Sequence, residues 1–243
     1  MILLENGGEH HNSAAVPRLR AIMAGVHDRG LRDALSIGVA TGVYAVSFGV
    51  LSVAAGFSVT QTCVMSLVAF TGASQFTFVS VMGAGGGVAG ALAPAALLAA
   101  RNGIYALSLG PVLGRGRWRR ALDAHLVIDE STAMAHAQRD PADRRRGFVL
   151  TAAAIFACWN AGTLAGALAG GVLGDPRSVG LDAVFPAVFL ALLVPQVRAR
   201  GALGTAIAGA AIAVLLLGVA PAGVPVMAAA LAAVPLLVRG ARP

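Results

Sequence analysis

The sequence predicts an all-α, polytopic membrane protein with about seven hydrophobic segments, one of the early ones re-entrant or broken. Hydrophobic residues make up 57% of the 243-residue chain and charged residues only 12%, whereas a soluble globular chain carries about 25% charge. A mean hydropathy of +0.78 also excludes an intrinsically disordered chain. The apolar runs lack the alternation of membrane β-strands, so the spanning pieces are expected to be helices.

Long uncharged runs, divided by Gly- and Pro-containing turns, locate the segments. Residues 34–100, 147–174, 183–197 and 201–238 contain no charged side chain. A span needs about 20 residues, and the predicted segments cover about 36–55, 61–82, 88–112, 148–173, 179–197, 202–219 and 223–238. Residues 1–33 are expected to form a polar cytoplasmic segment, and residues 34–243 a single transmembrane permease domain.

Arginine placement predicts the orientation, because positive charge collects on the cytoplasmic side. All 18 basic residues are arginines, and in the second half they flank alternate segment ends, which predicts a cytoplasmic C-terminus. In the first half, clusters before the first segment and after the third both favour the cytoplasm, yet three full crossings between them give the wrong parity. Either one segment does not cross, or the N-terminus is outside. The second segment is the best candidate for a re-entrant or broken helix, because its middle contains the small polar stretch Thr71-Gly72-Ala73-Ser74-Gln75.

Arg101 is the most unusual residue of the apolar segments. It lies near the middle of predicted segment 88–112, where an arginine costs about 2.5–3.5 kcal/mol even on an insertion scale. An intramembrane charge predicts a functional site, here a ligand for a substrate carboxylate with Asn102 beside it. The alternatives are an ion pair with Asp129, Glu130 or Asp182, or a helix that ends earlier.

The small polar residues of 71–75 form the second candidate feature. Such residues let a helix unwind, and half-helix ends bind carboxylate and ammonium groups in transporters. The alternative is a packing patch between helices, which is also the interpretation of the stripe Gly162, Gly166, Gly170 and Gly174. Trp159 is either a substrate contact or an interfacial anchor. The candidate substrate-binding residues are thus Thr71, Gly72, Ser74, Gln75, Arg101, Asn102 and Trp159.

Acidic residues near the membrane are candidates for proton or ion coupling. These are Asp129 and Glu130, in a weakly apolar stretch (124–138) expected to be a cytoplasmic, interfacial or partly inserted helix, and Asp182. For Asp129 and Glu130 the alternative is a helix-start charge or a partner of the arginine clusters, and for Asp182 a solvated loop. No metal, cofactor, nucleotide or hydrolase signature is present, and the arginine pattern does not favour nucleic acid. An enzyme is therefore not expected.

Six motifs in order resemble the AzlC family, the large subunit of branched-chain amino acid exporters. They include Phe70–Phe76, Arg101–Pro111, Asp129–Ala133 and Leu181–Phe189, and the resemblance covers about residues 35–200. It implies a bacterial inner-membrane permease that exports branched-chain amino acids together with a small AzlD-type subunit. The residues alone leave a passive channel and a non-transporting assembly subunit as alternatives to a secondary transporter.

Overall fold

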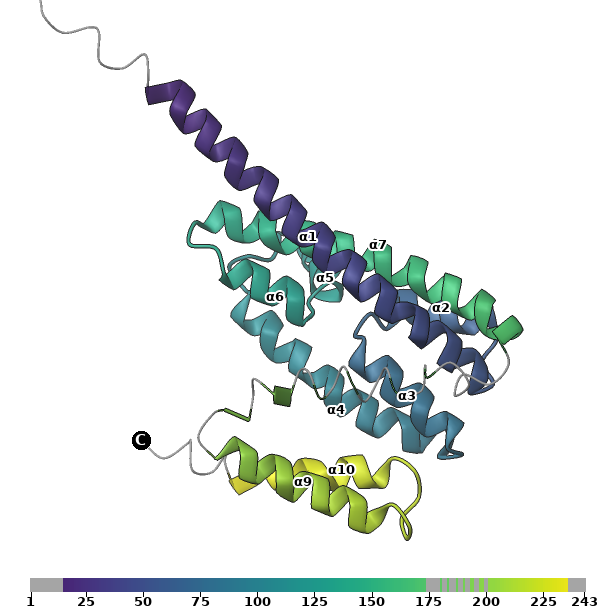
Figure 1. Ribbon diagram of the computed structural model, residues 1–243. Coiled ribbons are helices and arrows are strands. Elements are labelled where there is room, and N and C mark those ends of the chain that lie inside the picture. The colour runs from purple at the N-terminus through teal and green to yellow at the C-terminus, as the bar shows by residue number, and fades with distance from the viewer. Residues whose placement is uncertain are drawn as a thin grey trace, which may run out of the picture.

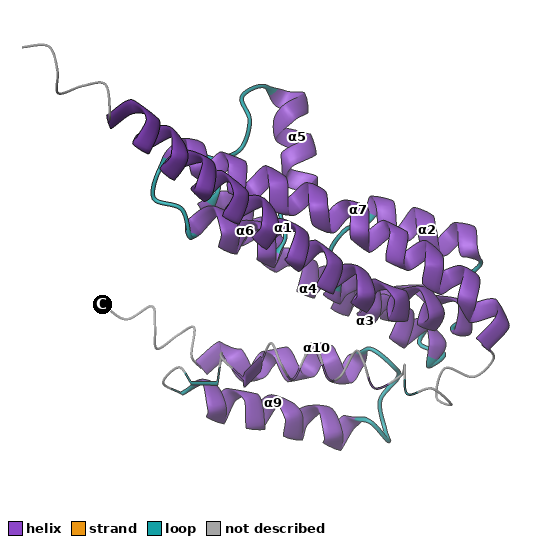
Figure 2. Ribbon diagram, turned by 45° about the horizontal axis from the view of Figure 1, so that its top comes forward, coloured by secondary structure: helices purple, strands orange, loops and turns teal. Residues whose placement is uncertain are grey.

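The chain folds into helices packed around a pair of long ones (Figure 1; Figure 2). The computed structural model describes residues 15–173, 180, 183, 187, 190, 193–194, 197–198 and 201–235, with side chains from Gly30 on. Those residues form helices and no strand. Three helical stretches among them, Gly30–Ala54, Gly87–Ser108 and Pro141–Val172, are long and apolar enough to cross a membrane. The predicted all-α membrane fold is confirmed.

Helices α1 (Ala15–Ala54) and α7 (Pro141–Leu173) form the centre of the fold and run parallel to each other. Gly162 and Gly166 of α7 lie against the backbone of Gly42 and Val46 of α1, so closely that no side chain fits at either glycine. Gly170 faces Val50 in the same register. The predicted packing role of the glycine stripe is confirmed for these three residues, because small residues let helix backbones approach. Gly174 lies outside the described residues.

The segment predicted at 61–82 is broken into α2 (Val59–Val68) and α3 (Ala73–Gly83). Both ends of this segment lie where α1 ends. Thr62 in the first turn of α2 hydrogen-bonds Ser52 near the end of α1, 2.8 Å between the hydroxyl oxygens, and Gly83 packs against Ala55. The chain therefore enters the bundle through α2 and returns to the same end through α3, as a re-entrant segment.

Helix α4 (Gly87–Ser108) then runs the full length of the bundle, from the end of α1 back toward the start of α7 (Figure 1). It ends four residues earlier than the sequence predicts. The stretch expected as one helix at 124–138 forms two short ones, α5 (Arg117–His125) and α6 (Asp129–His136). Between them Val127 and Ile128 are buried, so the chain bends in order to bury these apolar side chains.

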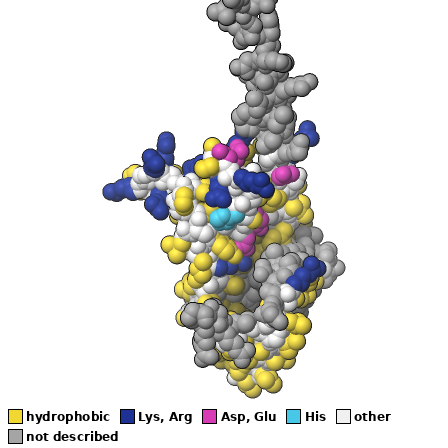
Figure 3. All heavy atoms as spheres, turned by 90° about the vertical axis from the view of Figure 1, so that its left-hand side faces the viewer, with side chains coloured by type: hydrophobic (Ala, Val, Ile, Leu, Met, Phe, Trp, Pro, Cys, Tyr) yellow, Lys and Arg dark blue, Asp and Glu magenta, His cyan; other side chains and the backbone are white. Residues whose placement is uncertain are grey.

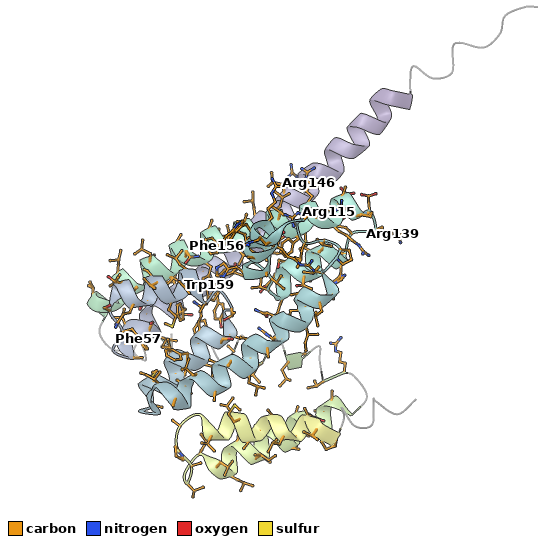
Figure 4. All side chains as sticks on the ribbon, turned by 180° about the vertical axis from the view of Figure 1, so that it is seen from behind. Phe57, Arg115, Arg139, Arg146, Phe156 and Trp159 are labelled. Atoms are coloured by element: carbon orange, nitrogen blue, oxygen red, sulfur yellow. The ribbon has the colours of Figure 1, made fainter. Side chains whose placement is uncertain are left out.

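One end of the bundle collects the basic side chains. Figure 4 shows Arg115, Arg139 and Arg146 near that end and Phe57 at the opposite one, with Trp159 and Phe156 in between. Figure 3 shows most charged side chains on the same part of the molecule, above a largely hydrophobic surface. Buried Asp123 of α5 accepts from Arg145 of α7 through both carboxylate oxygens, which anchors α5 to this end.

The C-terminal part forms a separate helical hairpin beside α4. Helices α9 (Ala202–Leu216) and α10 (Val224–Ala230) are followed by a short 3₁₀ turn, Leu231–Ala233. The connection at Gly223 packs against Gly90 near the start of α4. Most of predicted segment 179–197, including Asp182, lies outside the described residues. The boundary predicted at 33/34 falls inside α1 and stays a prediction.

Candidate functional site

A cavity of about 250 Å³ lies where the re-entrant segment meets α1, α4, α6 and α7. Every one of these elements contributes side chains to its wall. The polar lining residues are Thr41, Tyr44, Thr71, Arg101, Asn102, Asp129, Glu130 and Trp159. The apolar ones are Ala40, Phe70, Ala73, Ile128 and Ile155, with Gly72 at the break. The cavity is thus a small chamber with a charged part and an aliphatic and aromatic part.

The break between α2 and α3 forms one wall. Gly72 has a φ of +53°, a backbone conformation that favours glycine, and this lets the chain reverse direction inside the bundle. Gly72 and Ala73 place the first turn of α3 at the cavity, and the N-terminal end of a helix carries partial positive charge. The break therefore favours negative charge in the cavity.

Gln75 holds the break together and does not line the cavity. Its side-chain Oε1 accepts from the Gly72 N–H at 3.1 Å, and its Nε2 donates to the Met65 carbonyl at 3.3 Å. The residue is 1% exposed. Ser74 and Gln75 face a second pocket, on the side of α4, with apolar neighbours such as Phe78 and Leu92. The structure thus separates these two candidates from Thr71 and Gly72.

An ion pair joins α4 to α6 across the cavity. Arg101 Nη2 lies 2.9 Å from Asp129 Oδ2, and each side chain is about one-third exposed (33% and 30%). Since α4 ends at Ser108, Arg101 lies seven residues, about 10 Å, from the helix end. The ion pair with Asp129, one of the alternatives for Arg101, is confirmed. Arg101 also lines the cavity, and its role as a substrate ligand stays a prediction.

Glu130 adds a second carboxylate beside this pair. It lines the cavity at the start of α6, and among the described residues no arginine or histidine forms an ion pair with it. Burial raises the pKa of Glu130, and the neighbouring Asp129 carboxylate raises it further, while a backbone hydrogen bond and Arg101 lower it without reversing the shift. Glu130 therefore holds a proton more strongly than an ordinary glutamate does.

Aromatic side chains form the floor of the chamber. Tyr44 stacks on Phe76 with ring centroids 4.7 Å apart and meets Trp159 edge-on at 5.6 Å. Trp159 is only 4% exposed and lies in the interior of the bundle (Figure 4). The alternative role of Trp159 as an interfacial anchor does not fit this burial.

Three buried polar atoms around the cavity have no hydrogen-bond partner among the described residues. They are Trp159 Nε1, Asn102 Oδ1 and Asp129 Oδ1. A buried polar group without a partner costs about 1–3 kcal/mol, so such groups are expected to meet a ligand or water. One donor, two acceptors and a guanidinium beside carboxylates can bind a molecule that carries both an ammonium and a carboxylate group.

The structure brings seven of the ten predicted residues to one cavity. They are Thr71, Gly72, Arg101, Asn102, Asp129, Glu130 and Trp159. Ser74 and Gln75 lie outside it, and Asp182 falls outside the described residues. Sequence reasoning missed the lining residues Tyr44, Ile128 and Ile155. A tyrosine inside an uncharged run could have indicated Tyr44, whereas nothing in the sequence distinguishes Ile128 and Ile155 from other aliphatic residues. The described residues contain no cluster that could hold a metal ion.

The described residues thus form a helical membrane protein with a re-entrant segment and a charged cavity between its helices. The chain belongs to the AzlC family, since the model of the AzlC protein matches residues 36–173, more than half of the chain. The matched part contains every residue of the cavity. The family resemblance of the motifs is confirmed, and the chain has a transport-related role in a membrane.

Two relatives come from Helicobacter pylori, and each is named only as an uncharacterized membrane protein. The relative from strain 26695 is 26% identical over 155 residues, which covers 63% of this chain and 68% of the relative. The relative from strain J99 is 26% identical over 174 residues, which covers 71% of this chain and 76% of the relative. No solved structure matches the chain.

Proposed function

We propose that this chain is the substrate-carrying subunit of a secondary transporter that exports small neutral amino acids, with branched aliphatic side chains preferred. The observation that carries the proposal is the pairing of Arg101 with Asp129 on the wall of a small chamber. A substrate carboxylate would take the guanidinium, and its ammonium group would take the Asp129 carboxylate. Ion pairs of this kind exchange one partner for another at low cost, because both charges remain compensated.

The rest of the chamber supports a short aliphatic side chain. Ile128, Ile155 and Phe70 line it, and a volume of about 250 Å³ lies just below the range of about 300–1,000 Å³ typical of pockets for larger ligands. Phe70 also packs edge-on against Phe156 of α7, with ring centroids 5.1 Å apart, so this wall is firmly held. A large or doubly charged amino acid would not fit it.

The resemblance of the sequence motifs to the AzlC family implies three finer elements, which we include in the proposal. These are branched-chain amino acids as substrates, a bacterial inner membrane as the location and a small AzlD-type membrane subunit as the partner. Positive charge collects on the cytoplasmic side, so the arginine-rich end of the bundle would face the cytoplasm, and the C-terminus would lie there too. Export would then load the cavity from that end.

Whole-cell efflux tests the proposal. Cells that express the chain with the neighbouring small subunit would be loaded with labelled valine, leucine or isoleucine. Arg101→Ala is expected to reduce efflux to the level of cells without the protein, because the carboxylate ligand is lost. Arg115→Ala is the matched control, since this arginine is exposed at the end of the bundle, and it is expected to leave efflux unchanged. Normal efflux from a correctly inserted Arg101→Ala variant would refute the site.

A further inference from the structure

The charges of the cavity do not balance. Arg101 supplies one positive charge, whereas Asp129 and Glu130 supply one negative charge each when both are ionised. The Arg101 guanidinium is committed to Asp129 at 2.9 Å. A buried charge without a partner is costly, and the usual outcome is that the group stays neutral. In the empty cavity, therefore, the protonated form of the remaining carboxyl group is favoured over the ionised form.

The groups around Glu130 indicate that Glu130 is the carboxyl group that binds this proton. The titratable or charged groups that face it are Tyr44 of α1, Arg101 and Tyr105 of α4, and Asp129 of its own helix. The break and α7 contribute Thr71, Ile155 and Trp159 to the same cavity, and these residues do not titrate. No second cation among these neighbours can compensate an ionised Glu130.

We propose that Glu130 is the proton-exchange group of this carrier, and that a proton on Glu130 and the ammonium group of the substrate exclude each other in the cavity. The inference rests on the proposed transport function and deepens it by naming the coupling site. Its geometric basis is a single chamber that holds two carboxyl groups and one guanidinium, and that guanidinium pairs with Asp129.

The exchange balances in protons and in charge. In the empty state Glu130 is protonated, Arg101 pairs with Asp129, and the three groups are neutral together. When the amino acid binds, its carboxylate takes Arg101 and the Trp159 N–H, and its ammonium group lies between Asp129 and an ionised Glu130. The Glu130 proton leaves to the water on the side where the cavity is open. A proton from the other side restores the empty state after release.

This cycle is an electrogenic antiport. The substrate is neutral as a whole, so the loaded cavity carries one net negative charge and the protonated empty cavity carries none. Each turn therefore moves one amino acid out, one proton in and one positive charge in. Both the proton gradient and the membrane potential, about 2.3 kcal/mol per charge at 100 mV, would then drive export.

The pH dependence follows from the direction of the shift at Glu130. Because the pKa of Glu130 is raised, its carboxyl keeps the proton at pH values where an ordinary glutamate has lost it. Below that raised value the proton excludes the ammonium group, and substrate exchange slows. As the pH rises through it, Glu130 ionises and the substrate binds.

Everted membrane vesicles that contain the full-length chain, expressed with its neighbouring small subunit, separate the two steps. In these vesicles export appears as accumulation of labelled valine, leucine or isoleucine. One assay measures exchange of labelled for unlabelled amino acid without a gradient, and a second measures accumulation driven by an acidic lumen. Glu130→Gln carries a neutral side chain in place of the protonated acid, so it is expected to show at every pH the slow exchange that the wild type shows at low pH. It should also lose gradient-driven accumulation. Asp33→Asn, at an exposed acid of α1, is expected to behave like the wild type.

The outcomes distinguish the two proposals. Wild-type vesicles that show neither exchange nor accumulation would contradict the transport function itself. If the wild type shows both and Glu130→Gln still accumulates substrate with the wild-type pH profile, the coupling role is wrong and the transport function stands. Glu130→Asp covers the case in which Glu130→Gln does not insert: it should keep both activities with a shifted pH midpoint. An unchanged midpoint in Glu130→Asp would overturn the inference.

Discussion

Replacing Gln75 by leucine tests whether the break in the re-entrant segment depends on one side chain. The Gln75 amide accepts from Gly72 N–H and donates to Met65 O, and it thereby ties the end of α2 to the start of α3. Leucine has a similar size and keeps the apolar contacts, but it makes neither hydrogen bond. The variant therefore removes the brace without creating a large cavity.

The expected cost can be worked out from these two bonds. The Gly72 N–H would lose its partner inside the protein, which costs about 1–3 kcal/mol. The Met65 carbonyl would still accept from the Ala69 N–H, at 2.9 Å. Losing its second hydrogen bond, the one from Gln75, therefore costs about 1 kcal/mol. A total of about 2–4 kcal/mol corresponds to a Tm lower by about 4–16 °C for a chain of this size.

Thermal unfolding in detergent, followed by tryptophan fluorescence, measures the effect. Thr60→Leu is the matched control, because Thr60 is exposed on α2 and the change is expected to leave the Tm within about 1 °C of the wild type. A Gln75→Leu protein that melts with the wild type would show that the brace is dispensable. Loss of transport without a change in Tm would instead indicate that Gln75 contacts the substrate.

Two further predictions concern the cavity and the path of the chain. Trp159→Phe removes the unpartnered indole N–H, so KM for efflux is expected to rise about 2- to 12-fold. The Tm is expected to fall as well, because the smaller ring leaves a void among the core residues packed against Trp159. An unaltered KM would exclude this N–H as a ligand. In a chain without native cysteines, Ser58→Cys and Ala84→Cys should react with an impermeant thiol reagent from the same side, and Arg117→Cys from the other side. Labelling of positions 58 and 84 from opposite sides would mean that the segment crosses.

The sequence predicts the features that depend on local chemistry. Small polar residues around Gly72 indicate the break, and the glycine stripe on α7 indicates the contact with α1, because each depends on what a residue can do in its own backbone. Arg101 stands out because an arginine in an apolar run is costly wherever it lies. These signals need no knowledge of the neighbouring helices.

The remaining features depend on packing between distant segments. Nothing local shows that Tyr44 and Ile155 face the same chamber, because the parallel register of α1 and α7 decides it. The bend between α5 and α6 has no glycine or proline, and only the burial of Val127 and Ile128 against other elements explains it. For the same reason the sequence could not show that Thr71 lines the cavity while Ser74 and Gln75, only a few residues further on, face a different pocket.

The re-entrant path and the candidate site are consequences of the same break. If residues 59–83 crossed the membrane as one helix, the arginines after α4 would lie on the opposite side from Arg29 and Arg32, which precede the first apolar segment, against the charge rule. Such a helix would also carry Gly72 past the level of Trp159, and the start of α3 would no longer border the cavity. The reversal at Gly72 corrects the parity and supplies the wall that faces Arg101 and Asp129. A chain that crossed the membrane at residues 59–83 would therefore lose both the predicted orientation and this wall of the cavity.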